Sequence, residues 1–268
     1  MDAPWAAQPV RVSEEVTGLP LSEIVLERSE ELARTQVAQP ALFLVEWLAF
    51  LKLREAGVPC QVAAGHSLGE YAALAAAEVF SWEDAMSLVA ARGRVMEEAG
   101  RKQPGGMTAV VGLIAEQVEQ LAAETGCEVA NYNAPGQTVL AGGQEELERA
   151  GELAKERGGK AIPLAVAGAF HTPRMASAQE KLARSIEAVR FSSPGCTFVS
   201  GVTGRVESDP REISALLWRQ MTSPVRWTAV VGLLGELGVR EAVEVGPGRV
   251  LTRLGRMQTD AVGFRALG

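Results

Sequence analysis

Residues 61–77 read QVAAGHSLGEYAALAAA, and this stretch decides the fold. Its first four residues predict a short buried strand, and its alanine-rich second half favours a helix. Ser67 lies between them in the pattern Gly65-x-Ser67-x-Gly69. Glycines on both sides of the serine are expected to let the strand and the helix approach closely. The stretch therefore predicts a strand–turn–helix unit of an α/β protein, with a serine at the turn.

Ser67 is the first candidate catalytic residue, because a sharp strand-to-helix turn exposes a serine hydroxyl as a nucleophile elbow does. The Leu68 N–H lies at the predicted helix start, where unpaired donors and the helix dipole favour a developing oxyanion. The alternative is a plain strand-to-helix turn, since short glycine–serine patterns also arise by chance.

A nucleophilic serine needs a base, and the chain has two histidines. His66 adjoins Ser67 on a tight turn and is expected to point the opposite way. His171 directly precedes Thr172, a predicted helix cap, and a helix N-terminus favours a neutral imidazole that can accept a proton. The alternative is a buried, hydrogen-bonded histidine without catalytic work. No aspartate has an obvious place in a triad, so we predict a Ser–His dyad oriented by a backbone carbonyl.

Arg92 is the third candidate. At about 100° per residue it falls within the apolar stripe of a helix predicted from Ser81 to about Glu98, whereas Arg94 faces the other way. A guanidinium on a core-facing stripe needs an anionic partner or a ligand, and its planar fork suits a carboxylate. The alternative is a structural ion pair with a buried glutamate.

The N-terminal half carries two further predictions. The first 20 or so residues are weakly patterned and are expected to be partly disordered. Pro40 suits a first helical position, and residues 40–54 predict a buried helix because they are apolar on nearly every face.

The middle of the chain has a different pattern. Strands and helices between Met107 and Pro163 follow the order β-α-β-β-α-β, which is typical of a ferredoxin-like unit. We predict a small domain, residues 104–166, inserted into a larger discontinuous domain of residues 1–103 and 167–268.

After the insertion, strands again alternate with helices, which predicts a parallel sheet with covered faces. Thr172-Pro173 predicts a helix cap and first turn, and another helix is expected over residues 224–237. Gly246-Pro247-Gly248 lacks the lysine and the spacing of a phosphate-binding loop, so it is interpreted as a tight turn.

Composition excludes several classes of function. The chain has 268 residues, 47% of them hydrophobic, and a net charge of −7, which argues against general binding to nucleic acid or anionic membranes. Three single cysteines and two histidines predict neither a disulfide framework nor a metal site. No apolar run is long enough to span a membrane and no signal peptide is evident, so we expect a cytoplasmic protein.

Six stretches, in order along the chain, resemble the malonyl-CoA:acyl carrier protein transacylases and the acyltransferase domains of polyketide synthases. They are GHSLGEYAAL (65–74), AARGRVMEEAG (90–100), ANYNAPGQTVLAG (130–142), AGAFHTPRM (167–175), RQMTSPVRWT (219–228) and EVGPGRVLT (244–252). The resemblance implies an α/β-hydrolase-like large domain with an inserted ferredoxin-like small domain. It also implies transfer of malonyl from coenzyme A to the phosphopantetheine thiol of an acyl carrier protein.

The same resemblance implies roles for individual residues. Ser67 would accept the acyl group, His171 would be its base and Arg92 would hold the malonyl carboxylate. Gln220 would offer a backbone carbonyl to the histidine, and Phe170 is similar to the residue of malonyl-selecting members. No cofactor or metal is implied, because malonyl-CoA is a substrate and phosphopantetheine belongs to the partner.

One family feature has no counterpart here, namely an N-terminal strand and a Phe-Pro-Gly-Gln-Gly-like turn whose glutamine N–H is a second oxyanion donor. Gln8 lacks the flanking glycines. The chain is therefore expected to begin after that element, to expose a sheet edge and to lose about 10²–10³ in rate, unless another segment fills the place of the element. Two alternatives stay open at this point: an acyl-thioester hydrolase using the same dyad, and a non-catalytic partner of a synthase.

Overall fold

The strand that leads to Ser67 belongs to a three-stranded sheet of order β1-β6-β7 in the computed structural model, which describes residues 4–267. Its strands are β1 (Val62–Ala64), β6 (Thr197–Val199) and β7 (Val206–Glu207). β1 runs parallel to β6, whereas β7 returns antiparallel to it. β1 is therefore an edge strand of this sheet.

A second parallel pair, β8 (Glu241–Glu244) and β9 (Gly263–Ala266), forms a sheet of its own. The predicted parallel pairing is thus present, but in two separate short sheets. β7 and β9 were not predicted, because neither a two-residue strand nor a chain end gives a clear periodic pattern.

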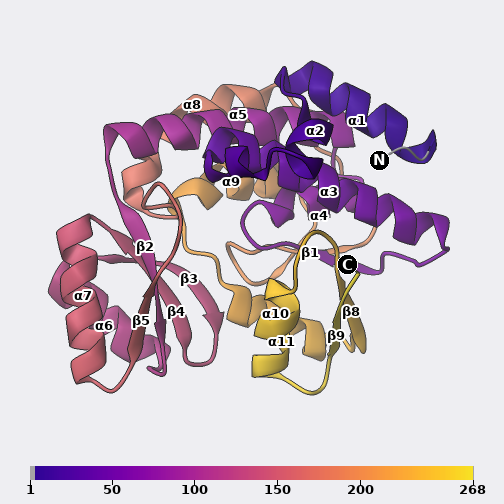
Figure 1. The fold of residues 1–268 in the computed structure, drawn as a ribbon. Coiled ribbons are helices and arrows are strands. Elements are labelled where there is room, and N and C mark those ends of the chain that lie inside the picture. Colours follow the sequence, from indigo (N-terminus) through magenta and orange to yellow (C-terminus); the bar gives the residue numbers. More distant parts are fainter. Residues whose placement is uncertain (1–3, 268) are drawn as a thin grey trace.

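Helices cover the β1 sheet and form most of the large core (Figure 1). They include α3 (Thr35–Glu55), α4 (Gly69–Ala76), α5 (Trp82–Lys102) and α8 (Ala176–Glu187). Phe43 and Leu44 of α3 are fully buried against Leu88 and Val89 of α5 in one cluster. Burial of apolar side chains at about 25 cal/mol per Å² holds these helices together.

The predicted start of α3 at Pro40 is wrong, because the helix begins five residues earlier, at Thr35. The Gln36 N–H donates to the Glu97 carboxylate of α5 at 3.0 Å, and this tertiary contact anchors the additional turn. Pro40 lies inside the helix and is buried.

The expectation of disorder near the N-terminus is also wrong for the described residues. Residues 4–33 form α1 (Pro4–Thr17), α2 (Leu21–Leu26) and a 3₁₀ turn, η1 (Ser29–Ala33). Ala6 is buried and Val10 packs against the large core, so tertiary burial stabilises a helix whose local pattern is weak.

The middle of the chain forms a four-stranded antiparallel sheet of order β3-β4-β2-β5, with two helices against it (Figure 1). The elements are β2 (Gly106–Val111), α6 (Ala115–Thr125), β3 (Glu128–Ala134), β4 (Gln137–Gly142), α7 (Gln144–Glu156) and β5 (Lys160–Pro163). Val110, Leu121 and Leu140 are fully buried in a separate core. The predicted ferredoxin-like unit is confirmed by this topology, and the exact limits 104–166 stay a prediction.

Val225 joins the four-stranded sheet β3-β4-β2-β5, here called the small sheet, to the rest of the protein. Its N–H donates to Ala130 O of β3, and its carbonyl accepts from Tyr132 N. Because this segment is extended, α10 begins at Trp227 and not at Pro224 as predicted.

The elements after the small sheet lie near their predicted positions, with one interruption after Thr172. Thr172 caps a 3₁₀ turn, η2 (Pro173–Met175), and α8 begins only at Ala176, whereas an uninterrupted helix was predicted. The other segments are α9 (Pro210–Arg219), η3 (Gln220–Thr222), α10 (Trp227–Glu236) and α11 (Val250–Gln258). Gly246 and Gly248 form the turn between β8 and α11, as expected.

Candidate active site

Ser67 sits in the turn between β1 and α4, in a strained backbone conformation with φ of 53°. Gly65 makes the turn possible, because a Cβ added there would lie 2.1 Å from the carbonyl carbon of Gly69. Gly69 has open space at its own Cβ position, so only Gly65 is required for the close approach, contrary to the expectation for both glycines.

Ser67 and His171 come together from positions far apart in the chain. Ser67 Oγ lies 2.7 Å from His171 Nε2, and His171 Nδ1 lies 3.0 Å from the carbonyl oxygen of Gln220. Because that carbonyl can only accept, it places the proton on Nδ1 and leaves the Nε2 lone pair for the serine hydroxyl. The pair has the geometry of a nucleophile and its base.

The imidazole of His171 is neutral in this environment. Burial and the nearby positive charge of Arg92 lower the pKa of His171 to about 3. Its φ of 61° is also strained, and the turn is held by Thr172 Oγ1, which donates to Ala169 O at 2.7 Å. A neutral ring with a free Nε2 is the form that can take a proton.

Arg92 is buried, with 1% of its surface exposed, beside the dyad. Its Nη1 donates to Gln39 Oε1 at 2.6 Å, and its Nη2 donates to Ser67 Oγ at 3.0 Å and to Gln220 Oε1 at 3.2 Å. Within residues 4–267 no carboxylate lies within ion-pair distance of this guanidinium, and its Nε has no partner. The structural ion pair considered above is therefore not formed.

The direct hydrogen-bond acceptors of Arg92 are neutral, and the acidic Glu70 acts on its charge from beyond the Gln220 side chain that both residues contact. Arg94 of the same helix is exposed, so the predicted division between the two arginines is correct. The guanidinium next to Ser67 is thus available to an anionic ligand.

Two polar residues of the site, Gln39 and Glu70, were missed from the sequence. Glu70 is buried in the first turn of α4 and accepts from Gly201 N at 2.9 Å, from Ser200 Oγ at 3.0 Å and from the Gln220 side chain. The Gln220 amide also donates to Ser67 O at 3.0 Å. A charged residue in an otherwise apolar helix was the available signal for Glu70, whereas nothing local distinguishes Gln39.

The remaining candidates occupy different positions. Leu68 is the N-cap of α4 and buried, so its backbone lies at the positive end of the helix. Phe170 is partly buried and packs against both the large core and the inner face of the small sheet. His66 Nε2 forms a hydrogen bond of 2.9 Å with Asn133 Oδ1, not with Ser67.

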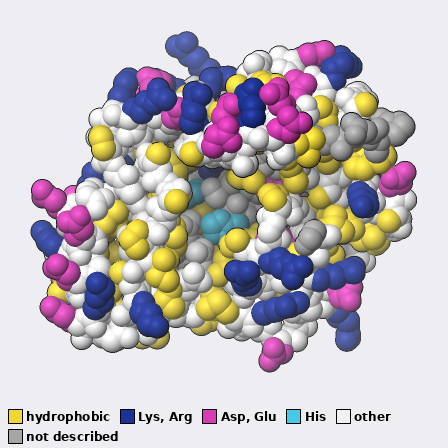
Figure 2. Space-filling view, in the orientation of Figure 1, with side chains coloured by type: hydrophobic (Ala, Val, Ile, Leu, Met, Phe, Trp, Pro, Cys, Tyr) yellow, Lys and Arg dark blue, Asp and Glu magenta, His cyan; other side chains and the backbone are white. Residues whose placement is uncertain are grey.

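Histidine atoms are visible in a hollow on one face of the molecule, between the small sheet and the larger part (Figure 2). Over residues 4–267 the side chains include no cluster of three or more His, Cys, Asp or Glu that could bind a metal ion. Among the same residues, no helix combines the length and apolar character needed to cross a membrane.

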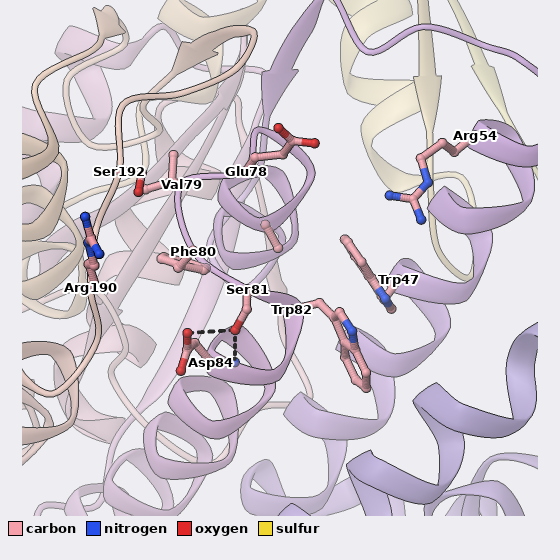
Figure 3. A pocket seen from close by; sticks show the side chains of 11 residues that line it. Trp47, Arg54, Glu78, Val79, Phe80, Ser81, Trp82, Asp84, Arg190 and Ser192 are labelled. Atoms are coloured by element: carbon pink, nitrogen blue, oxygen red, sulfur yellow. Dashed lines mark hydrogen bonds between the residues drawn. The ribbon is translucent and has the colours of Figure 1, made fainter.

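Two cavities of about 470 Å³ each lie apart from the dyad and share Trp47, Arg54 and Trp82. Figure 3 shows the two tryptophans, from α3 and α5, beside each other in one of them. Gln8 lines the second cavity, so it is not part of the Ser67 site. None of the predicted site residues lines either cavity.

Residues 4–262 match the acyl transferase domain family. The chain belongs to this family. It is 40% identical over 246 residues to the malonyl CoA-acyl carrier protein transacylase of Salmonella typhimurium, covering 89% of this chain and 79% of that protein. It is 41% identical to the polyketide biosynthesis protein ThaF of Burkholderia thailandensis, but spans only 21% of that longer protein.

Solved structures agree with the family. An acyl carrier protein S-malonyltransferase from Vibrio cholerae superposes with a TM-score of 0.94 at 34% identity, covering 99% of this chain and 89% of that one. A malonyl-transacylase in complex with its type II PKS acyl-carrier protein gives a TM-score of 0.92 at 36% identity, with coverages of 98% and 88%. The α/β fold with an inserted ferredoxin-like unit is thus that of the malonyltransferases.

Proposed function

We propose that this protein transfers a malonyl group from malonyl-CoA to the phosphopantetheine thiol of an acyl carrier protein. One observation carries the proposal: a buried guanidinium that forms no direct ion pair within residues 4–267 lies 3.0 Å from the nucleophilic serine. An acyl group that ends in a carboxylate supplies a direct anionic partner, whereas an acetyl group does not. The names of the relatives support the same substrate class.

In the first half-reaction, His171 Nε2 takes the proton of Ser67 as Oγ attacks the thioester carbonyl of malonyl-CoA. The Leu68 N–H donates to the developing oxyanion at the start of α4. Arg92 gives up its contact with Ser67 Oγ and binds the malonyl carboxylate. Collapse of the tetrahedral intermediate expels coenzyme A and leaves a malonyl-serine ester. The departing coenzyme A thiolate takes the proton from His171.

In the second half-reaction, the phosphopantetheine thiol of the carrier protein enters the same site. His171 takes the thiol proton, the sulfur attacks the malonyl ester and Ser67 leaves with the proton returned by His171. The Gln220 carbonyl keeps the imidazole in one tautomer throughout. Phe170, beside His171, is the proposed contact that selects malonyl over larger acyl groups.

The bound substrate also adjusts the base. Burial, and after it the positive charge of Arg92, lowers the pKa of His171 in the free protein. When the malonyl carboxylate neutralises that guanidinium, the pKa of His171 rises and the imidazole becomes a stronger base. A substrate with a carboxylate is therefore expected to speed the attack of Ser67 on its thioester, because it makes His171 a stronger base.

The test is incubation with radiolabelled malonyl-CoA, followed by addition of a carrier protein that bears phosphopantetheine. We expect stable label on Ser67, no label in the Ser67→Ala variant, and passage of the label to the carrier. Rapid release of free malonate would instead indicate a thioester hydrolase, and absence of labelling would indicate a non-catalytic partner.

The proposal involves no cofactor beyond the two substrates. The partners are malonyl-CoA and a carrier protein, and neither nucleic acid nor a membrane takes part. A cytoplasmic location stays a prediction.

A further inference from the structure

Two of the three cysteines are in contact, although they lie far apart in the sequence. The Sγ atoms of Cys60 and Cys196 are 3.6 Å apart, and both residues are partly exposed. The third, Cys127, is buried under the small sheet. Nothing in the sequence indicates this contact, because each cysteine stands alone.

The surrounding strands hold the two thiols in place. Cys60 lies two residues before β1 and Cys196 immediately precedes β6, and these strands pair in parallel. The pairing extends back to the cysteines, since Thr197 N donates to Gln61 O at 3.1 Å. The sulfur atoms are thus held near each other, and a disulfide bond would shorten their separation from 3.6 Å to about 2.05 Å.

We propose that Cys60 and Cys196 form a reversible disulfide that ties β1 to β6 when the protein meets a low-molecular-weight disulfide such as oxidised glutathione. This redox site is separate from the Ser67 site, which lies beyond the other end of β1. It acts on the strand that carries the nucleophile, and it does so without touching the catalytic residues.

The exchange proceeds in two balanced steps. The Cys60 thiolate attacks one sulfur of oxidised glutathione, forming a mixed disulfide and releasing one glutathione thiolate, which takes up a proton. Cys196 then attacks the Cys60 sulfur after losing its own proton, forming the protein disulfide and releasing the second glutathione. Overall, the protein dithiol loses two protons and two electrons, and oxidised glutathione gains them to become two glutathione thiols.

The local chemistry favours this order of attack. The hydrogen bond from Cys196 lowers the pKa of Cys60 to about 7, so a large share of Cys60 is thiolate near neutral pH. The same contact and burial raise the pKa of Cys196. Once Cys60 is in the mixed disulfide, its charge no longer opposes ionisation of Cys196, which can then attack.

The disulfide is expected to stabilise the fold. β1 is a three-residue edge strand that pairs with β6 alone, so a covalent link beside it closes a long loop and limits the unfolded chain. The expected rise in melting temperature is about 5–10 °C. Malonyl loading of Ser67 should change less than about twofold, because the link is remote from Ser67.

The experiment exposes the purified protein to oxidised glutathione, blocks the remaining thiols by alkylation and maps the peptides by mass spectrometry. The wild type and the matched control Cys127→Ser should both yield a Cys60–Cys196 linked peptide. Cys60→Ser should remain unlinked, and Cys196→Ser should stop at a glutathione adduct on Cys60. Dithiothreitol should reverse both the link and the rise in melting temperature.

Two results would overturn the proposal. One is a wild-type protein in which both thiols remain free or stop at mixed disulfides with glutathione. The other is a linked peptide without a rise in melting temperature, which would remove the stabilising role. Both readouts are independent of acyl transfer.

Discussion

Two of the three sheets in the described residues differ greatly in build. In the small sheet, β2 pairs with β4 over six residues and with β5 over four, and the sheet has its own core. In the sheet that carries Ser67, β1 pairs with β6 over three residues and lies at the edge. The small sheet has the longer strand ladders, whereas the sheet with the short ladders carries the candidate nucleophile, Ser67.

The difference shows which contacts fix the position of the backbone in each region. Long strand ladders fix the small sheet through repeated backbone hydrogen bonds. The Ser67 turn depends instead on individual long-range contacts, those of Gln220, Glu70 and Arg92, made by side chains from several elements. Changes in the first region should act on stability, and changes in the second on chemistry.

The largest effect is expected from Gly65→Ala. Its Cβ would overlap the backbone of Gly69, so the turn must shift and move Ser67 away from His171. We expect malonyl loading to fall by about 10²-fold or more, as measured by labelling of Ser67.

Gly136→Ala is the matched control in the small sheet. This glycine has a φ of 74° but open space at its Cβ position. The change should cost roughly 1–2 kcal/mol of stability and leave loading unchanged. Equal loading by the two variants would contradict the special role of the Ser67 turn.

Leu140→Ala tests the small core directly. Leu140 is fully buried in β4, and its truncation should lower the free energy of unfolding by about 2–5 kcal/mol in a urea titration. Malonyl loading by the remaining folded protein should stay near that of the wild type. A large loss of loading in folded protein would mean that the small core positions the dyad.

Arg92→Ala is expected to lower loading from malonyl-CoA by about 10–150-fold, corresponding to about 1.5–3 kcal/mol for a charged bidentate contact. Loading from acetyl-CoA should fall little or not at all. The comparison of the two substrates by rapid-quench labelling separates carboxylate binding from a structural role.

Arg94→Ala provides the control, since this exposed arginine lies on the same helix. It should leave both substrates unaffected. If Arg92→Ala reduced loading from both thioesters equally, the guanidinium would serve the structure and not the substrate.

The smallest effect concerns pH. The pKa of His171 in the free protein is about 3, so the base loses activity only as the pH falls toward that value. Between about pH 5.5 and 7.5, kcat/KM for loading should change less than twofold. A histidine with an ordinary pKa near 6.5 would lose about tenfold by pH 5.5, and that result would contradict the assignment of a desolvated base.

Part of this organisation was predictable from the sequence. The Ser67 turn follows from a local pattern, because a buried strand, Gly65 and an alanine-rich helix are adjacent in the chain. Arg92 was predicted from helical periodicity, and the ferredoxin-like unit from the order of its elements. In each case the physical cause acts over a few residues or one helix face.

Other features were not predictable, because their causes act across the fold. The N-terminal helix α1 is stabilised by burial of Ala6 against the large core, not by its local pattern. Gln39 becomes part of the site only because α3 packs against α5. Nothing near Gln39 in the sequence indicates this contact.

The sequence by itself determined which residues could carry acyl transfer, because Ser67, His171 and Arg92 each follow from short-range patterns and from the motifs around them. Only the tertiary structure decided that they meet, with 2.7 Å between serine and histidine and 3.0 Å between arginine and serine. It also decided that Arg92 forms no direct ion pair among residues 4–267 and that Cys60 contacts Cys196. The reason is physical: desolvation, charge compensation and thiol proximity depend on which distant segments share a buried volume.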